Sequence, residues 1–530
     1  MGTSVATPCR HAVLVQDFLE LSAARLPDKV ALVCDGRRLT YAEIDSAANR
    51  LARAMVGLGV RRGDRVAIHL PNSVEAVVSI FAILKAGAAF VVINPTTKRD
   101  KLIYILNNCR ATALVTEARS ELAGLADAPD RSVPSLAGCI LCGATPPDDR
   151  AGAIQRLAWD TVMAREDGTR PARLNIDLDL ACLIYTSGTT GDPKGVMSDH
   201  SNVTFAAGSI IEYLGNVESD IVINVLPLSF DYGLYQLLMV FKFGGTLVLE
   251  RTFTYPAVVL KRMVQERVTG FPGVPTLYAM LLPMDLSGFD LSSLRYLTNT
   301  AAALPVSHIE ALRRKFPHAT LFSMYGLTET KRTLFLPPTE LDRRPGSVGI
   351  PIPGTEAWIE SETGARLGPG EVGELVVRGR HVMRGYWEAP EMTARRYRTE
   401  PSTGDRLCYT NDLFKTDEDG FFYFVSRKDD IIKSRGEKVA PKEVEAVLYA
   451  LPGIQEAAVV GVPDAVLGQA VKAYLVSTDP NVTEKQVLAH CRARMEDYMV
   501  PKLIEFCSAL PKTESGKITK KGLGGVTAGG

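Results

Sequence analysis

The sequence predicts an α/β protein whose larger part has mostly parallel sheets flanked by helices. Apolar residues recur at helical spacing in some segments, and short apolar runs of strand character lie between them. This alternation along the chain is typical of parallel strands joined by helices. Helices are predicted over 40–60, 74–85, 234–241 and 442–448, and strands over 65–70, 88–93, 180–184, 221–226, 246–249, 320–324, 457–462 and 470–476.

The first predicted helix has a clear start signal. Thr40 is expected to cap it, with Glu43 three residues later as the partner in a capping box. Leu51, Ala54 and Met55 then recur at the spacing of one helical face.

The pattern changes after the turn at 368–370. Segments 372–378 and 421–425 are predicted as short antiparallel strands between turns, whereas 125–150, rich in Pro, Asp, Gly and Ala, is predicted as a loop.

Composition bounds the class of protein. A chain of 530 residues is too long for a single core. Lys and Arg total 60, as do Asp and Glu, which argues against a basic nucleic-acid-binding surface. Nine cysteines scattered along the chain suggest neither a disulfide framework nor a zinc site. No apolar run reaches the ~20 residues of a membrane span, and the first residues lack a secretory signal pattern, so we expect a cytoplasmic protein.

One stretch has the composition of a phosphate-binding loop. Residues 185–195 follow the predicted strand 180–184 and combine hydroxyl side chains, glycines and a lysine. Glycines let main-chain N–H groups approach an anion, and hydroxyls and lysine add hydrogen bonds and charge. It is not a Walker A loop, and the alternative is a Gly/Thr-rich surface turn. The predicted phosphate ligands are Thr186, Ser187, Gly188, Thr189, Thr190, Gly191 and Lys194.

This loop resembles the phosphate loop of the adenylate-forming superfamily, which includes acyl-CoA synthetases, nonribosomal peptide synthetase adenylation domains and luciferases. Four further segments resemble motifs of that family, in the family order, so that the likeness spans roughly residues 15–520. They are 324–330, with Tyr-Gly-Leu-Thr-Glu-Thr; 409–412, which ends in aspartate; 426–436, the hinge motif; and 511–517, which ends in the catalytic lysine.

The resemblance implies two domains. Residues 1–428 would form a large domain for ATP and the carboxylate substrate, with a small β-barrel-like part. Residues 429–530 would form a small, mobile α+β domain. The hinge would lie at Asp429, and Gly436 would line the path of the thiol after the small domain rotates.

The resemblance also implies a nucleotide site. Tyr325 would pack on adenine, Asp412 would accept from the ribose hydroxyls, and Arg427 would contact ribose or phosphate. Thr328 would donate to the α-phosphate and Glu329 would hold Mg²⁺. The alternatives are a turn position for Asp412, a solvated turn glutamate at Glu329, and a surface arginine paired with Asp429 for Arg427.

Lys517 is the implied catalytic residue. Carboxylate and ATP repel each other, so a cation must bridge them, and the resemblance gives this role to Lys517. Judged by spacing alone, Lys517 is one more surface lysine beside Lys512, Lys520 and Lys521.

The acid is less constrained. Asp231 falls where amino-acid-activating relatives carry the aspartate that pairs with the substrate ammonium; its alternative is the N-cap of the next helix. Asn299 and Thr300 occupy a segment that looks closer to acyl-CoA ligases. Lys331, followed by Arg332, is a further pocket candidate that could contact a carboxylate, a phosphopantetheine phosphate or only solvent.

The leading expectation is therefore a free-standing enzyme that uses ATP and Mg²⁺ to adenylate an amino acid, such as a β-amino acid or proline. It would then load the phosphopantetheine of a separate carrier protein. The alternative is an acyl-CoA ligase for an aliphatic or aromatic acid, with CoA as the thiol. A third alternative, a nucleotide-binding scaffold without catalysis, conflicts with the presence of Lys517, Glu329 and Asp412.

Overall fold

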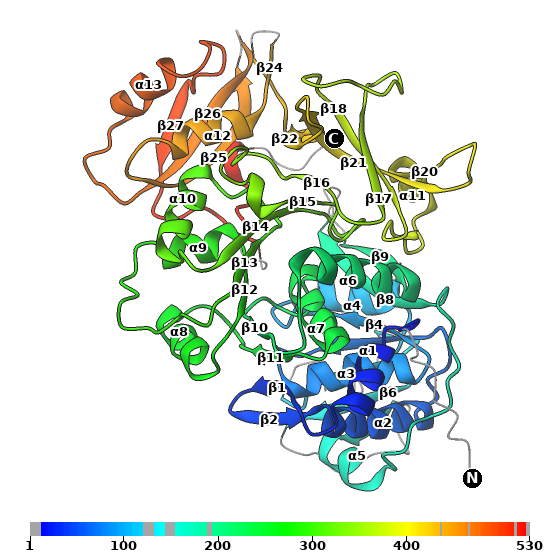
Figure 1. Cartoon of the computed structure of the whole chain (residues 1–530). Helices are drawn as coiled ribbons and strands as arrows, with labels where there is room; N and C mark the ends of the chain where they lie inside the picture. The colour runs from blue at the N-terminus through cyan, green and yellow to red at the C-terminus, as the bar shows by residue number, and fades with distance from the viewer. Residues whose placement is uncertain are drawn as a thin grey trace, which may run out of the picture. The chain divides into compact units, whose positions relative to one another are not determined.

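The structure is a computed structural model that describes residues 12–119, 132–143, 154–187, 193–434, 437–464, 467–513 and 517–525. Packing divides the chain into two compact units, which are described separately below (Figure 1). The first contains Met1–Gly270 and Arg380–Thr393, and the second contains Phe271–Gly379 and Ala394–Gly530. This division does not test the boundary expected at Asp429, which stays a prediction.

The first unit contains a mixed sheet whose central strands are parallel. Its order is β19-β9-β8-β4-β3-β5-β6-β7. The pairs β8–β9 and β9–β19 at one edge are antiparallel. The other strand pairs of this sheet are parallel, as expected for strands that alternate with helices. The strands are β3 (Arg65–His69), β4 (Ala89–Val92), β5 (Ala111–Glu117), β6 (Gly138–Cys142), β7 (Gln155–Ala158), β8 (Leu180–Ser187), β9 (Pro193–Asp199) and β19 (Gly385–Tyr386).

A second group of strands in this unit has the order β10-β11-β1-β2. Strands β10 (Ile221–Asn224), β11 (Thr246–Leu249) and β1 (Val30–Cys34) run parallel, and β2 (Arg37–Thr40) returns antiparallel to β1. The helices of this unit are α1 (Asp17–Arg25), α2 (Tyr41–Gly57), α3 (Val74–Lys85), α4 (Arg99–Asn108), α5 (Trp159–Arg165), α6 (His200–Leu214), α7 (Asp231–Phe243) and α8 (Pro256–Gln265).

The capping signal predicted for the first long helix is confirmed. The Thr40 side chain accepts from the Glu43 N–H, and the Glu43 carboxylate accepts from the Thr40 N–H at 2.8 Å. The pair satisfies N–H groups that the helix itself cannot. The helix predicted over 74–85 has the bounds of α3.

The loop predicted over 125–150 is partly wrong. Strand β6 (Gly138–Cys142) lies inside this range and pairs in parallel with β5 and β7. All five of its residues are buried. The Pro, Gly and Asp residues around it obscured a run whose stability comes from its two neighbouring strands.

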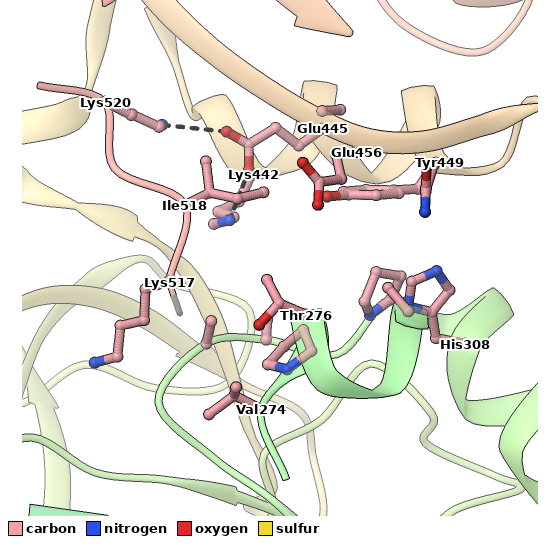
Figure 2. A pocket seen from close by; sticks show the side chains of 17 residues that line it. Val274, Thr276, His308, Lys442, Glu445, Tyr449, Glu456, Lys517, Ile518 and Lys520 are labelled. Carbon is pink, nitrogen blue, oxygen red and sulfur yellow. Dashed lines mark ion pairs between the residues drawn. The ribbon is translucent and has the colours of Figure 1, made fainter. Parts of the chain in front are cut away.

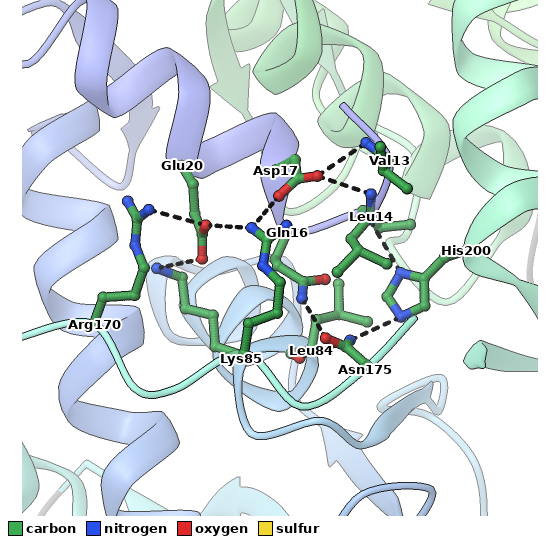
Figure 3. Close-up of polar contacts among 12 residues, drawn as sticks. Val13, Leu14, Gln16, Asp17, Glu20, Leu84, Lys85, Arg170, Asn175 and His200 are labelled. Atoms are coloured by element: carbon green, nitrogen blue, oxygen red, sulfur yellow. Dashed lines mark hydrogen bonds and ion pairs between the residues drawn. The ribbon is translucent and has the colours of Figure 1, made fainter. Parts of the chain in front are cut away.

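A buried ionic cluster joins α1, α2 and α3 to the segment that precedes β8. Figure 3 shows its residues Glu20, Lys85 and Arg170. Lys85, only 5% exposed, lies 2.6 Å from an Asp45 oxygen and 3.5 Å from a Glu20 oxygen. Arg170 and Arg173 also pair with Glu20. Charges at this depth are tolerated because each has an opposite partner.

His200 starts α6 beside this cluster and is fully buried (Figure 3). Its Nδ1 accepts from the Val15 N–H at 3.0 Å, and Nε2 lies 3.1 Å from Asn175 Nδ2. Burial lowers the pKa of His200 from 6.5 to about 4. The imidazole is therefore neutral in the folded protein at neutral pH.

The second unit begins with strands that carry polar residues at their ends. Strands β13 (Tyr296–Asn299) and β14 (Thr320–Tyr325) are parallel, and β15 (Leu334–Leu336) and β16 (Ile350–Pro351) continue antiparallel. Strand β12 (Gly270–Gly273) lies at the junction of the two units along the chain. The helices here are α9 (Pro275–Leu281) and α10 (Val306–Lys315).

An antiparallel sheet follows, as the short strands predicted near 372–378 and 421–425 indicate. Its order is β17-β18-β21-β20, with β22 also paired to β21. The strands are β17 (Thr355–Glu360), β18 (Gly373–Gly379), β20 (Tyr397–Thr399), β21 (Arg406–Thr416) and β22 (Phe422–Arg427).

The last sheet is covered on both faces. Side chains alternate along β25, so Ala457 and Val459 face one hydrophobic cluster, while Ala458 and Val460 face another. The first cluster includes residues of the helices over 441–449 and 484–492. The second cluster includes Leu510 and packs against Ile518. The elements are β23 (Ile432–Ser434), β24 (Glu437–Val439), α12 (Pro441–Tyr449), β25 (Ile454–Asp464), β26 (Gly468–Ser477), α13 (Glu484–Arg492) and β27 (Leu503–Phe506).

No helix among the described residues is both long and apolar enough to cross a bilayer. The described cysteines are free thiols, and all except Cys507 are buried.

Candidate active site

The site is built around a buried carboxylate on the antiparallel sheet. Asp412, in β21, is 6% exposed. The Tyr325 hydroxyl donates to its Oδ2 at 2.6 Å, and Arg427 Nε donates to its Oδ1 at 3.1 Å. Asp412 therefore lies in a strand instead of a turn, and Arg427 pairs with Asp412 instead of the alternative partner Asp429.

Burial sets the electrostatics of this group. It raises the pKa of Asp412, and Arg427 and the Tyr325 hydroxyl lower it part of the way back. Burial, together with the neighbouring Asp412, raises the pKa of Tyr325 well above its ordinary value. Tyr325 is thus a permanent donor, and Asp412 keeps oxygen lone pairs for further donors such as hydroxyl groups.

Glu329 lies in the turn after β14 and has a cationic neighbour that the sequence did not reveal. Arg396, the last residue of α11 (Pro390–Arg396), places Nη2 3.9 Å from Glu329 Oε1. The Arg396 side chain is 14% exposed and the Glu329 side chain is 13% exposed. Arg396 also lowers the pKa of Asp412, so it acts on both carboxylates.

The turn that carries Glu329 is compact. A Cβ added at Gly326 would lie 1.8 Å from the Lys331 carbonyl oxygen, so only glycine fits there. Thr328 is half-buried in this turn. Lys331, at φ 55°, is 1% exposed, and Arg332 is 3% exposed. Neither cation faces bulk solvent, which corrects the commonest expectation for adjacent basic residues.

Asn299 is the last residue of β13, the strand next to β14, and Thr300 follows it. They are 1% and 2% exposed. Asn299 Nδ2 donates to the Ala302 carbonyl at 3.1 Å. Among the described residues, Asn299 Oδ1 and Thr300 Oγ1 have no hydrogen-bond partner. Buried polar atoms of this kind favour a polar ligand at the end of the strand.

Lys517 lines a cavity of about 700 Å³, counted to its open mouth (Figure 2). Residues 274–276 and 302–308 contribute to one wall, and residues of α12 and β25 to the other. The Lys517 backbone is held by Thr513: the Thr513 N–H donates to the Lys517 carbonyl at 2.7 Å, and the Lys517 N–H donates to Thr513 Oγ1 at 3.1 Å.

The predicted hinge residue also has a defined partner. Asp429 lies in the short 3₁₀ helix Lys428–Asp430, and its Oδ2 accepts from Asn411 Nδ2 at 2.7 Å. The preceding Lys428 lies 2.5 Å from Glu374 Oε2.

The remaining predicted residues belong to the first unit or lie outside the described residues. Thr186 and Lys194 are opposite each other in the β8–β9 pair, and Ser187 ends β8. Asp231 is 5% exposed and is the first residue of α7, whose N-cap is Phe230, so the N-cap alternative for Asp231 is wrong by one position. Gly188, Thr189, Thr190, Gly191 and Gly436 fall outside the described residues.

Comparisons with known proteins agree with this arrangement. The chain matches the AMP-binding enzyme family over residues 19–387 and the AMP-binding enzyme C-terminal domain over residues 443–517. A long-chain-fatty-acid–CoA ligase of Bacillus subtilis is 34% identical over 96% of this chain and 94% of its own length. A feruloyl-CoA synthase of Amycolatopsis is 35% identical over 93% and 95%, respectively.

Solved structures extend the likeness to the fold. The anthranilate CoA ligase AuaEII, in complex with anthranoyl-AMP, has a TM-score of 0.87 at 30% identity and covers 97% of this chain and 96% of its own. The o-succinylbenzoate CoA synthetase MenE of Bacillus subtilis, in complex with ATP and magnesium, has a TM-score of 0.80 at 28% identity, covering 96% and 99%.

This chain belongs to the AMP-binding enzyme family. It is an ATP-dependent, AMP-forming ligase that joins an acid to a thiol, and the α/β fold predicted from the sequence is confirmed.

Proposed function

We propose that this enzyme is an acyl-CoA ligase that activates an aliphatic or aromatic acid without an ammonium group and transfers it to CoA. The observation that carries the proposal is the nearly full-length similarity to enzymes that are named as CoA ligases for fatty and aryl acids. The amino-acid alternative depends on Asp231, and loading of a separate carrier protein has no comparable support.

We assign the adenosine half of ATP to the Asp412 cluster. Asp412 would accept from the ribose hydroxyls, Arg427 would keep that carboxylate ionised, and Tyr325 would present its ring to adenine. The donor that Tyr325 gives to Asp412 fixes the carboxylate in one orientation, which reduces the entropy lost when ATP binds.

We assign the α-phosphate to the turn after β14, where Thr328 would donate to it. The contacts of Thr186, Ser187 and Lys194 with phosphate oxygens, which the sequence resemblance implies, stay predictions. The described residues contain no group of three or more metal-binding side chains. Glu329 would therefore hold Mg²⁺ together with ATP phosphates, as is usual for this metal. Mg²⁺ supplies charge neutralisation for the departing pyrophosphate.

The acid would lie beside the end of β13, where Asn299 and Thr300 offer polar atoms. In the first half-reaction a carboxylate oxygen attacks the α-phosphorus, and pyrophosphate leaves. Lys517 would bridge the two anions and stabilise the charge that develops between them. In the second half-reaction the thiol loses its proton, its sulfur attacks the acyl carbon, and AMP leaves.

ATP–pyrophosphate exchange over a panel of fatty, aryl, α-amino and β-amino acids tests the proposal. Acids without an ammonium group should promote exchange, and free CoA should then yield a thioester with release of AMP. Exchange with amino acids alone, or transfer to a phosphopantetheinylated carrier but not to CoA, would restore the amino-acid alternative. Release of ADP and orthophosphate with every acid would exclude an AMP-forming ligase.

A further inference from the structure

Ion pairs to buried carboxylates lie on both sides of Lys517 along the chain. Lys512, before it, lies 2.6 Å from an oxygen of Glu456 in β25. Lys520, after it, lies 3.2 Å from Glu445 Oε1 in α12 (Figure 2). The side chains of Glu456 and Glu445 are 10% and 3% exposed.

Backbone contacts make this segment a small antiparallel ladder. Lys512 and Ile518 are paired as an isolated bridge, and the Thr519 N–H donates to the Pro511 carbonyl at 2.9 Å. Ile518 packs against the apolar cluster that contains Ala458 and Val460 of β25. In Figure 2, Lys520 points toward Glu445 and Lys517 points away from it. In this short segment, Lys512 and Lys520 are therefore held by carboxylates, and the Lys517 side chain points elsewhere in the cavity.

Of the two carboxylates, Glu445 is the more deeply buried and makes further contacts. Its Oε1 also accepts from the Val459 N–H at 3.0 Å, and its Oε2 lies 2.6 Å from Lys442 Nζ. Burial opposes ionisation, but Lys442 and Lys520 bring the pKa of Glu445 below its ordinary value. A carboxylate that is ionised at this depth requires its cations, so the Lys520 contact is strongly favoured.

Lys520 also reaches toward the predicted hinge. Its Nζ lies 3.9 Å from Oδ2 of Asp430, the residue after Asp429. The same ammonium therefore joins α12, the start of the predicted small domain and the segment that follows Lys517. A rotation about Asp429 would carry these three elements as one body.

We propose that Lys520 and Glu445 are positioning residues that fix the backbone at Lys517 for the adenylation half-reaction. This inference rests on the proposed role of Lys517. A lysine side chain is long and flexible, so its ammonium is placed accurately only if the backbone of the residue is fixed. Misplacement by about 1 Å costs a catalytic group about 100-fold in rate.

The test compares Lys520→Met with Lys520→Arg in the full-length enzyme. Methionine removes the charge but keeps much of the stem, whereas arginine restores a donor for Glu445. Lys521→Met is the matched control, because Lys521 is the next residue and is exposed. Lys502→Met removes the ion pair between Lys502 Nζ and Asp464 Oδ2, which lie 2.5 Å apart. It controls for a general loss of stability when an ion pair of the same sheet is removed.

Three readouts separate positioning from folding. In Lys520→Met, kcat for ATP–pyrophosphate exchange should fall by about 10-fold or more, with KM for ATP within about twofold. Transfer from supplied acyl-adenylate to CoA should stay near wild type. Hydrogen exchange at the Thr513 and Lys517 amides should accelerate. Lys520→Arg should recover most of the kcat, and both controls should resemble wild type.

The outcomes distinguish this inference from the proposed function. Normal exchange kinetics in Lys520→Met, equal loss of both half-reactions, or unchanged protection of the Thr513 and Lys517 amides would each overturn the positioning role. If the wild-type enzyme adenylates no acid, the proposed function fails, and the amide protection alone decides whether Lys520 fixes the backbone at Lys517.

Discussion

Asn411 donates from Nδ2 to Oδ2 of Asp429 at 2.7 Å. Asn411 has a φ of 57°, a left-handed conformation that asparagine tolerates better than most residues. The next residue, Asp412, belongs to the proposed ribose site. Strand β21 therefore places the proposed nucleotide contact and the contact to the predicted hinge residue on adjacent residues.

Asp429→Pro should separate the two half-reactions. Proline fixes φ near about −65° and so opposes rotation at the hinge. Thioester formation should fall by about 100-fold or more, whereas ATP–pyrophosphate exchange should stay within a few-fold of wild type. Asn411→Gly is the control, because it keeps the left-handed backbone and removes only the side-chain hydrogen bond, worth about 1 kcal/mol. Equal loss of both half-reactions in Asp429→Pro would contradict the hinge.

Lys517→Ala should have the opposite effect. If Lys517 bridges the two anions as proposed, its loss should reduce ATP–pyrophosphate exchange by about 100-fold or more. Reaction of a supplied acyl-adenylate with CoA should persist. Both rates are measured by quench-flow or by separation of products, with Lys521→Ala as the control. Near-normal exchange in Lys517→Ala would refute a role in adenylation.

Tyr325→Phe should change the pH dependence of ATP binding. The Tyr325 hydroxyl lowers the pKa of Asp412, so its removal raises that pKa further, and the ribose acceptor becomes protonated at a higher pH. At the acid end of the activity profile, KM for ATP should rise about 10-fold more than in wild type. Tyr409→Phe, which removes a hydroxyl 3.0 Å from Glu360, is the control. Parallel profiles for Tyr325→Phe and wild type would contradict this coupling.

His200 should make folding sensitive to acid. Its pKa is about 4 in the folded protein, against an ordinary 6.5. Because the folded-state value is depressed, the stabilisation is complete above pH 6.5 and is lost as the pH falls from 6.5 to about 4. The loss should approach an upper limit on the order of 3 kcal/mol.

Chemical denaturation at several pH values measures this loss. His200→Asn keeps an acceptor for the Val15 N–H and should flatten the dependence, whereas the exposed control His318→Asn should not. An unchanged slope in His200→Asn would assign acid sensitivity to other groups.

Lys85→Met should destabilise the first unit. The substitution leaves Asp45 and Glu20 without a cation at their centre, so the free energy of unfolding should fall by about 3 kcal/mol. Arg37→Met removes an exposed ion pair with Glu75 and should cost about 0–1 kcal/mol. Similar midpoints of denaturation for the two variants would show that the buried cluster is not stabilising.

Local patterns predicted the regular elements well, since their causes lie within a few residues. The capping box of Thr40 and Glu43 is one example, and the apolar face of α2 is another. Strand β6 was missed because its residues Gly138–Cys142 give a weak local signal, and pairing with β5 and β7 supplies the stability.

The candidate site shows the same limit. Motifs identified Tyr325, Asp412 and Arg427, and the structure brings these three together. Arg396 and Lys520 were not identified, because their partners Glu329 and Glu445 are distant along the chain. Arg396 follows another arginine and Lys520 precedes another lysine, so composition gave no reason to separate them from ordinary surface charges.

The absence of space at Gly326 bears on efforts to alter the acid preference of this enzyme. Even a methyl group there would displace the main chain at Lys331, and Thr328 and Glu329 lie between these two positions. If codon 326 is randomised in a library, most of the resulting variants should therefore be inactive. Diversity directed to Asn299 and Thr300 in the proposed acid site, with the glycine kept, would leave the turn intact.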